Sequence, residues 1–497
     1  MATMVAIDLG AQSGRVALGR FDGERLTVSD VHRFPNVPVQ TRGVLQWDVL
    51  RLFGDVLEGL RAAGRDGVHV DSLSVDSWGV DFGLLDRKGR LLQNPVHYRD
   101  ARRADAVDRM LAEVPARELY ERTGIQLMPI NTVFELAAMA GDGDPALEAA
   151  ETMLMIPDLL HYWLGGPPVC ELTNATTTQC LDARTHTWEV DLLERLDVPA
   201  RVFPEVVQPG ALLAPLAAEV ASESRLDGAM VVAGATHDTG AAVAAIPFRR
   251  SGSVFISAGT WSLVGLELPR PLIDDRTYEA NLTNEGGVAG TVRLLRNVAG
   301  LWLLHESRRT WALAGREYTF DELVALAERA TPFRSLVDPN DPLFAPPDAM
   351  PQRIREFCAR TDQPQPEDPA AVTRCILESL ALKHAQTIEL LHRATGIEPA
   401  EVHVVGGGAR NELLCRWTAA AAGVPVVCGP AEAAEIGNLC VQAIALGELA
   451  SIEDARAVVA ASFEPIVYEP EDNDAWREAG ERFRTIASAL PLEEVEA

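Results

Sequence analysis

Apolar and polar residues follow a hairpin-like pattern that occurs twice along the chain. Residues 5–18 read VAIDLGAQSGRVAL and residues 254–268 read VFISAGTWSLVGLEL, so both contain an apolar run, a turn rich in glycine and hydroxyl residues, and a second apolar run. This pattern predicts a β-hairpin whose turn presents backbone N–H groups and a small hydroxyl side chain. Two such hairpins, half a chain apart, predict two domains with similar cores.

The other patterns in the first quarter of the chain predict a sheet with covering helices. Val5–Gly10, Arg15–Phe21 and Leu26–Phe34 are typical of a three-stranded meander, because turn residues separate their apolar runs. Trp47–Ala63 carries apolar side chains at helical spacing, and Leu73–Val75 predicts a further strand. A mixed α/β sheet follows from this order of elements.

Three patterns near the centre bear on the candidate chemistry. Val231–Ala233 predicts a strand that ends in a loop, and the small residues of Ala241–Ile246 predict a helix after that loop. The run of small hydroxyl residues over Thr173–Thr178 predicts a loop.

The length predicts more than one domain. The chain has 497 residues, which exceeds the roughly 250–300 residues at which one hydrophobic core stops growing. We expect an N-terminal domain over 1–246 and a C-terminal domain over 247–470. Residues 402–427 predict a βαβ unit in the latter, and 471–497 a C-terminal helix with an acidic tail.

Composition narrows the class of protein. Hydrophobic residues make up 47% and charged residues 23%, which is typical of a globular protein and predicts no membrane partner. The formal net charge of −28 argues against nucleic acid as a partner. The first residues carry no export signal, so we expect a cytoplasmic protein. The oligomeric state is left open.

The cysteines predict neither a zinc site nor a disulfide framework. Seven are scattered along the chain without a C-x-x-C pair or zinc-finger spacing. A bridge between Cys358 and Cys375 is left open, but free thiols are favoured in a cytoplasmic protein.

Both hairpin turns carry groups that suit a phosphate chain. Asp8 ends the first strand, where a carboxylate suits the water shell of Mg²⁺, and 10–15 add glycines, a hydroxyl and a guanidinium. Thr260, in the second turn, offers a hydroxyl and an N–H group. The alternative is that Asp8 only caps its turn and that Trp261 only packs the second one.

The glycine triplet 406–408 follows a predicted strand but does not predict a dinucleotide site. The G-x-G-x-x-G fingerprint needs glycine where Asn411 stands, and an acidic residue is missing after the next strand. A hydride-transfer enzyme is therefore disfavoured. Bare backbone at the triplet suits an adenosine pocket instead.

Asp238 is the candidate catalytic residue. It lies between His237 and Thr239 on the loop after a buried strand, where a carboxylate suits proton transfer from a hydroxyl that attacks a phosphoryl group. The alternative role is a helix N-cap, and the same alternative applies to Asn297. Gly79 suits close approach of a sugar ring, and the alternative there is a turn packed by Trp78.

Taken together, the motifs resemble those of the FGGY carbohydrate kinases. The resemblance covers nearly the whole chain in order and rests on DLGAQSGR at 8–15, SVDSWGVDF at 74–82, TNATTTQ at 173–179, HDT at 237–239, SAGTWSL at 257–263, TNEGG at 283–287, GLWLL at 300–304 and VVGGGARN at 404–411.

The resemblance implies an α/β protein with the two-domain hexokinase/actin-like (ribonuclease H-like) ATPase fold and a duplicated core. Within the family it is strongest to members that transfer the γ-phosphate of ATP to the 1-hydroxyl of L-rhamnulose, with Mg²⁺ and Asp238 as general base. It implies that the N-terminal domain, 1–246, binds sugar and phosphate and that the C-terminal domain, 247–470, binds the nucleotide. It implies sugar contacts at Gly79, His237, Asp238, Thr239 and Asn297, and ATP contacts at Ala11, Gln12, Ser13, Gly14, Arg15, Thr260 and Gly408.

One position departs from the family pattern. His305 stands where the pattern has a glutamine that contacts the nucleotide, and imidazole lacks the two-sided contact of an amide. We retain His305 as an ATP-site candidate. Two rival functions stay open: a kinase for another sugar or polyol, such as fuculose, xylulose or glycerol, and a non-kinase ATPase related to actin or heat-shock chaperones.

Overall fold

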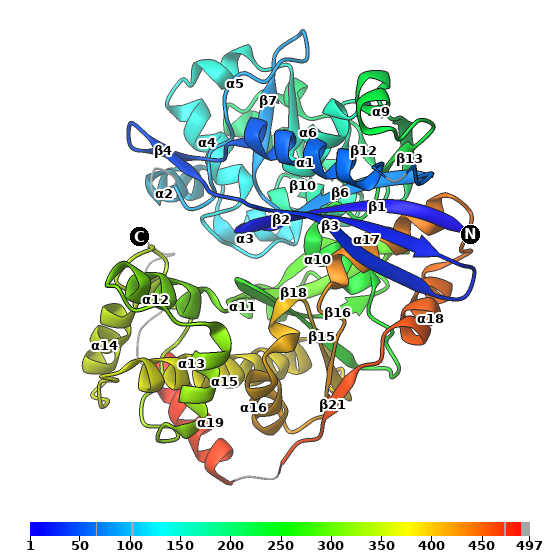
Figure 1. Cartoon of the computed structure of the whole chain (residues 1–497). Helices are drawn as coiled ribbons and strands as arrows, with labels where there is room; N and C mark the ends of the chain where they lie inside the picture. Colours follow the sequence, from blue (N-terminus) through cyan, green and yellow to red (C-terminus); the bar gives the residue numbers. More distant parts are fainter. Residues whose placement is uncertain (66, 101–103, 472–473, 489–497) are drawn as a thin grey trace. The chain divides into compact units, whose positions relative to one another are not determined.

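The computed structural model describes residues 1–65, 67–100, 104–471 and 474–488 (Figure 1). These residues form two compact units that interleave along the chain. The first unit contains 1–247, 267–294 and 433–463, and the second contains 248–266, 295–432 and the residues from 464 onward. The first boundary between the units lies after residue 247, next to the predicted domain boundary. Segments 267–294 and 433–463, which lie inside the predicted C-terminal domain of 247–470, belong to the first unit. The end of the predicted acidic tail, 489–497, lies outside the described residues.

The first unit is built on a six-stranded sheet in the order β13-β14-β6-β1-β2-β3. The predicted meander is confirmed, because β1, β2 and β3 are neighbouring antiparallel strands. β6 pairs in parallel with β1 on one side and with β14 on the other. The strands are β1 (Ala2–Leu9), β2 (Ser13–Phe21), β3 (Leu26–Pro35), β6 (Ser72–Ser77), β13 (Ala211–Pro215) and β14 (Met230–Ala233).

Helices α1, α6, α10 and α17 pack close to this sheet. In Figure 1, α17 is drawn in orange beside the blue strands, although more than 400 residues separate it from β1 along the chain. Gly437 of α17 permits a close approach to α10, since a Cβ atom there would lie 1.8 Å from the Ala241 carbonyl oxygen. These four helices are α1 (Val49–Ala63), α6 (Ile156–Trp163), α10 (Asp238–Ala244) and α17 (Ala433–Ala445). The unit also contains α9 (Ala218–Ser224) and α18 (Ile452–Ser462).

The first unit also contains smaller elements, several of which contribute to a cluster of buried apolar side chains that includes Phe134, Met153 and Leu193. They are β4 (Val39–Thr41), β5 (Val44–Gln46), β7 (Phe82–Leu85), α2 (Ala104–Glu113), α3 (Ala116–Thr123), α4 (Thr132–Gly141), α5 (Pro145–Ala149), β8 (Thr152–Met155), β9 (Cys170–Glu171), α7 (Leu172–Ala175), β10 (Leu181–Asp182), β11 (Thr187–Trp188), α8 (Val190–Arg195), β12 (Val206–Val207), α11 (Asp275–Glu279) and β17 (Thr283–Gly286).

The second sheet has the order β17-β18-β16-β15-β19-β20-β21, and the repeated hairpin, formed by β15 and β16, lies inside it. The predicted βαβ unit is confirmed as parallel strands β19 and β20 with α16 between them. The further elements are β15 (Ser253–Ala258), β16 (Trp261–Leu268), β18 (Val292–Ala299), α12 (Trp302–Leu313), α13 (Phe320–Arg329), α14 (Met350–Arg360), α15 (Pro369–Thr395), β19 (Glu401–Val405), α16 (Glu412–Ala422), β20 (Val426–Cys428), β21 (Ile466–Tyr468) and α19 (Asp474–Ser488).

The cysteine and membrane predictions can be compared with this fold. All seven cysteines are buried free thiols, so the alternative of a bridge between Cys358 and Cys375 is wrong for this structure. Among the described residues, no helix has the length and apolar character needed to cross a membrane.

A buried histidine side chain accepts a hydrogen bond from the backbone of β6 beyond the positions at which β14 pairs with that strand. Paired positions of these strands are Ser72 with Met230 and Leu73 with Val231. Two residues further on, the backbone N–H of Val75 donates instead to Nε2 of His161 on α6, at 2.8 Å. Burial lowers the pKa of His161 from 6.5 to about 3, because the charged imidazole is poorly solvated there.

We expect this histidine to make stability fall on acidification. Its folded-state pKa lies below its unfolded-state value, so its contribution is complete above about pH 6.5 and is lost as the pH falls toward 3. The His161→Gln variant retains an acceptor for Val75 but does not titrate. Denaturant unfolding between about pH 6 and pH 5 should give a pH slope smaller by up to about 1.4 kcal/mol per unit. The exposed His69→Gln control should keep the wild-type slope, and an equal slope in His161→Gln would contradict the account.

Candidate functional site

The first hairpin turn is held by backbone contacts that leave its side chains accessible. The Gly10 N–H donates to the Ser13 carbonyl oxygen at 2.9 Å, and the Asn36 side chain donates to the Gly10 carbonyl oxygen at 2.9 Å. Gln12 and Ser13 are exposed, Ala11 and Arg15 are half-buried, and Gly14 is buried. The turn thus brings Ala11, Gln12, Ser13, Gly14 and Arg15 together, as the sequence predicts.

Four acidic residues lie near this turn and act on one another electrostatically. We call them the carboxylate cluster: Asp8, Asp76, Asp238 and Glu435. Asp8 and Asp76 are register partners on the parallel strands β1 and β6. Burial and then the charge of Glu435 raise the pKa of Asp8 well above its usual range, whereas the Arg15 guanidinium lowers it. Burial and then the Asp8 charge raise the pKa of Asp76. The cluster therefore concentrates negative charge in a largely dehydrated space.

Helix α17 contributes polar side chains to the same place. Glu435, Asn438 and Gln442 follow one another at intervals of three and four residues, so they lie on one face of the helix. Glu435 is ion-paired with Arg15, and the Asn438 amide donates to Asp76 Oδ2 at 2.6 Å. Gln442 donates to Asn438 at 2.7 Å and to the Val5 carbonyl oxygen at 2.9 Å. This ladder of hydrogen bonds anchors Asp76 and Arg15 to the helix.

Gly79 lies in a tight turn that the threonine-rich segment supports. Val80 has φ of 69°, a region that β-branched residues rarely adopt, and its N–H donates to Thr177 Oγ1 at 3.0 Å. Trp78 is buried and donates to Asp81 at 2.9 Å, so the packing role proposed as an alternative is present as well. The prediction of a loop over Thr173–Thr178 is wrong: α7 and a 3₁₀ turn over Thr176–Thr178 form a buried helical segment there.

The buried carboxylate of Glu171 joins this segment to the loop that precedes Asp238. It accepts hydrogen bonds from the backbone N–H and hydroxyl of Thr173, at 2.9 and 2.5 Å. It also accepts from the backbone N–H and hydroxyl of Thr236, at 2.9 and 2.7 Å. The Thr173 hydroxyl in turn accepts from the His237 N–H at 3.1 Å. The backbone around His237 is thus fixed on both sides.

Asp238 opens helix α10, but it is not the N-cap. His237 occupies the N-cap position and Asp238 is the first helical residue, so the cap alternative is wrong for Asp238. Its Oδ1 atom accepts from the backbone N–H and hydroxyl of Thr239, at 2.5 and 3.1 Å, and lies 3.4 Å from His237 Nε2. Among the described residues Oδ2 accepts no hydrogen bond, and the side chain is 32% exposed. One oxygen is therefore held by the protein while the other is available to a ligand.

In the second unit, three glycine-containing motifs meet at the β15–β16 turn. A Cβ atom on Gly300 would lie 2.6 Å from the Trp261 carbonyl carbon, and one on Gly408 would lie 2.5 Å from the Ala258 Cβ atom. The Gly300 N–H also donates to the Thr260 carbonyl oxygen at 3.1 Å. Thr260 and Gly408 therefore lie close to one common turn.

His305 and Asn297 also belong to the second unit. His305 is a half-buried residue of α12 that packs edge-on against Phe320, and burial lowers its pKa to about 4. Asn297 lies inside strand β18 and its carbonyl oxygen accepts from Asn340, so the N-cap alternative is wrong there too.

Several residues of this arrangement escape the sequence analysis. Glu171, Glu285 and Arg293 are buried charged residues beside His237 and Asp238. Arg293 stands in the apolar run 292–295 and Glu171 follows the apolar residues 169–170, and a charged residue in such a place usually has a buried partner. Glu285 stands in the polar motif at 283–287, which carries no such signal. The signal identifies Arg293 and Glu171 as unusual, but only the fold identifies their partners.

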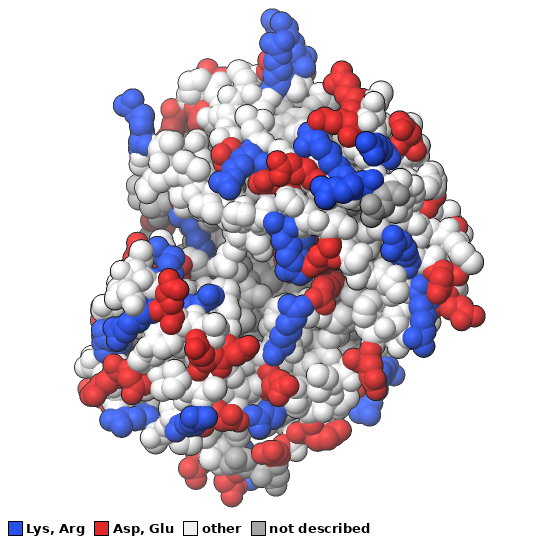
Figure 2. Space-filling model, in the orientation of Figure 1, with Lys and Arg blue, Asp and Glu red and all other residues white. Residues whose placement is uncertain are grey.

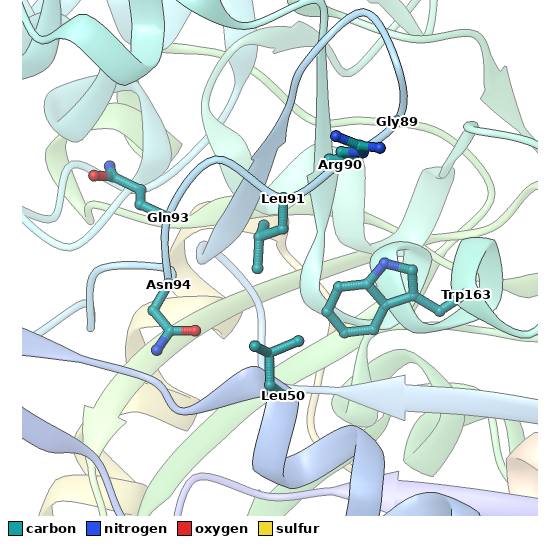
Figure 3. Close-up of a pocket in the computed structure, with 7 residues that line it drawn as sticks. All are labelled: Leu50, Gly89, Arg90, Leu91, Gln93, Asn94 and Trp163. Carbon is teal, nitrogen blue, oxygen red and sulfur yellow. The ribbon is translucent and has the colours of Figure 1, made fainter.

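Two surface features of the described residues lie apart from the predicted site. A pocket in the first unit is lined by Leu50, Gly89, Arg90, Leu91, Gln93, Asn94 and Trp163, with Leu50, Leu91 and Trp163 facing the hollow (Figure 3). None of the predicted site residues lines it. On the face drawn in Figure 2, acidic and basic side chains are intermixed.

Comparison with family models places both halves of the chain in one group of enzymes. Residues 3–245 match the N-terminal domain, and 254–446 the C-terminal domain, of the FGGY family of carbohydrate kinases. The chain is 42% identical to the Rhamnulokinase of Bacteroides thetaiotaomicron, covering 96% of this chain and 98% of that protein. It is 39% identical to the Rhamnulokinase of Enterococcus faecalis, covering 95% of both.

Solved structures agree on the fold. The xylulose kinase of Lactobacillus acidophilus superposes with a TM-score of 0.81 over 100% of both chains at 17% identity. The Plasmodium falciparum glycerol kinase with ADP gives a TM-score of 0.78 over 99% of this chain and 98% of the other, at 14% identity. The predicted two-domain α/β kinase fold is thereby confirmed.

Proposed function

The chain belongs to the FGGY family of carbohydrate kinases, and from this membership we propose that it transfers the γ-phosphate of ATP to the 1-hydroxyl group of L-rhamnulose. The products would be L-rhamnulose 1-phosphate and ADP, and the reaction would serve L-rhamnose catabolism in the cytoplasm. The observation that carries the choice of sugar is the near full-length identity of 36–42% to proteins named Rhamnulokinase. The alternative of a non-kinase ATPase has no comparable support.

We assign the general-base role to Asp238. Its Oδ1 atom is occupied by Thr239 and lies near His237, which holds the carboxylate in one orientation. The accessible Oδ2 atom is then the acceptor for the proton of the attacking hydroxyl. His237, Thr239, Gly79 and Asn297 are proposed to contact the sugar.

The phosphate chain is assigned to the two hairpin turns. Ala11–Arg15 and Thr260 offer backbone N–H groups and hydroxyls, and Gly408 is assigned to the nucleoside, with His305 as a further contact. Asp8 would hold Mg²⁺, which neutralises charge on the phosphates when bound. The carboxylate cluster fits such an ion, because it offers carboxylate oxygens from the register partners Asp8 and Asp76. Burial first, and then neighbouring carboxylates, raise the pKa of both groups, so a bound cation would offset the charge that they carry there.

A coupled assay of ADP release across ketoses and polyols tests the choice of sugar. We expect L-rhamnulose to give the highest kcat/KM among L-rhamnulose, L-fuculose, D-xylulose and glycerol, each measured with ATP and Mg²⁺. A much larger kcat/KM for another compound would overturn the sugar assignment. ADP release that is indifferent to every sugar would overturn the kinase function itself.

The Asp238→Asn variant tests the general base. We expect kcat to fall by about 10²–10⁴-fold, because the amide cannot accept the proton, while the KM for ATP changes by less than about twofold. Asp227→Asn, an exposed residue of the same unit, is the matched control and should be as active as wild type. Wild-type turnover in Asp238→Asn would show that Asp238 has only a structural role.

Adjacent glycines provide a matched test of the nucleotide site. Gly408 is buried against Ala258, whereas a Cβ atom on the exposed Gly407 would meet no atom within 4 Å. Gly408→Ala should raise the KM for ATP about tenfold or more by displacing the turn, and Gly407→Ala should leave it nearly unchanged. Equal KM values for ATP in the two variants would remove Gly408 from the nucleotide site.

A further inference from the structure

Arg293 is a buried cation that touches the ring of His237 from the side opposite Asp238. Its side chain, on β18, is 0% exposed. The Nε atom donates to the Gly286 carbonyl oxygen at 2.9 Å and Nη2 donates to the Thr173 carbonyl oxygen at 3.3 Å. Nη1 lies 3.1 Å from Glu285 Oε2, and both Nη atoms lie 3.2 Å from His237 Nδ1. A buried arginine with this many partners is held in one position.

The guanidinium restricts which nitrogen of His237 carries the proton. Arginine has N–H donors and no acceptor, so a nitrogen that faces two of its N–H groups must offer a lone pair. Glu285 Oε2 lies 3.3 Å from the same Nδ1 atom and is the competing acceptor for a proton there. Burial opposes ionisation of Glu285, whereas the Arg293 charge, and after it a hydrogen bond and charge from His237, lower its pKa. Glu285 Oε2 lies closer to Arg293 Nη1, at 3.1 Å, than to His237 Nδ1, at 3.3 Å, so we take the carboxylate as the partner of Arg293. Both Nη atoms of Arg293 then face Nδ1 as donors.

We propose that Arg293 is a positioning residue that fixes His237 as the tautomer with its proton on Nε2, so that this nitrogen donates a hydrogen bond to an oxygen of the sugar. The edge of the ring that carries Nε2 lies beside Asp238, since Nε2 is 3.4 Å from Asp238 Oδ1. His237 then supplies the donor while Asp238 Oδ2 accepts the proton of the hydroxyl. This inference rests on the proposed function for its sugar, but not for the tautomer itself.

The geometry requires arginine rather than any cation. The planar guanidinium reaches Nδ1 with two N–H groups while Nε and Nη2 hold the carbonyl oxygens of Gly286 and Thr173. A lysine ammonium is a single point of donors on a flexible stem and cannot span these partners together. Arg293→Lys keeps the charge beside Glu285 but removes the fork.

Nitrogen NMR of the sugar-free wild-type protein tests the tautomer directly. Protein labelled with ¹⁵N-histidine distinguishes a protonated ring nitrogen from one with a lone pair, and His237→Gln assigns the signal. We expect Nε2 to be protonated and Nδ1 to carry the lone pair. A proton on Nδ1 would overturn the proposal. This result does not depend on which sugar is phosphorylated, so it stands apart from the outcome of the substrate assay.

Kinetics of Arg293→Lys test whether that state matters to the reaction. With the sugar that wild type uses best, we expect kcat/KM for the sugar to fall at least about tenfold and the KM for ATP to stay within about twofold. Arg276→Lys, an exposed arginine paired with Asp274 in the same unit, should behave as wild type. Unchanged sugar kinetics in a folded Arg293→Lys protein would overturn the positioning role. If that variant unfolds, the wild-type NMR result still decides the tautomer.

Discussion

The buried carboxylate of Glu171 is the constraint on which the surroundings of His237 and Asp238 depend. By accepting hydrogen bonds from Thr173 and Thr236, it ties the helical threonine segment to the loop that carries His237 and Asp238. The same threonine segment supports the Gly79 turn through Thr177. A carboxylate buried this deeply is costly unless its partners are complete, so the four donors hold both segments in place together. Positions far apart in sequence thereby become one rigid group.

The charges beside this group form a chain rather than isolated pairs. Arg293 lies against Glu285 and His237, and His237 lies against Asp238. Within the carboxylate cluster, Arg15 is paired with Glu435, and the Asn438 amide donates a hydrogen bond to Asp76. Because α17 comes from the last fifth of the chain yet belongs to the first unit, folding of that unit must bring residues 433–463 together with the N-terminal half of the sequence. The two units are therefore interleaved along the chain and do not simply follow one another.

The strength of each sequence prediction follows from how local its physical cause is. The hairpins, the meander and the βαβ unit depend on alternation and turn residues within a few positions, and they are confirmed. The prediction of a loop for the threonine run is wrong because its hydroxyls bond to buried backbone and carboxylate partners that only the fold provides. Likewise, the glycine motifs indicate close approach, but Ala258 as the neighbour of Gly408 is a long-range contact. Arg293 carries no local signal of its partner His237.

The central claim is that the protein holds His237 and Asp238 ready, one as donor and the other as proton acceptor. A crystal structure with L-rhamnulose bound tests it most directly. The account predicts a sugar hydroxyl within hydrogen-bond distance of Asp238 Oδ2, a second sugar oxygen at His237 Nε2, and Arg293 still at Nδ1. A sugar bound with its hydroxyls away from Asp238 Oδ2, or a His237 ring turned so that Nδ1 leaves Arg293, would contradict it.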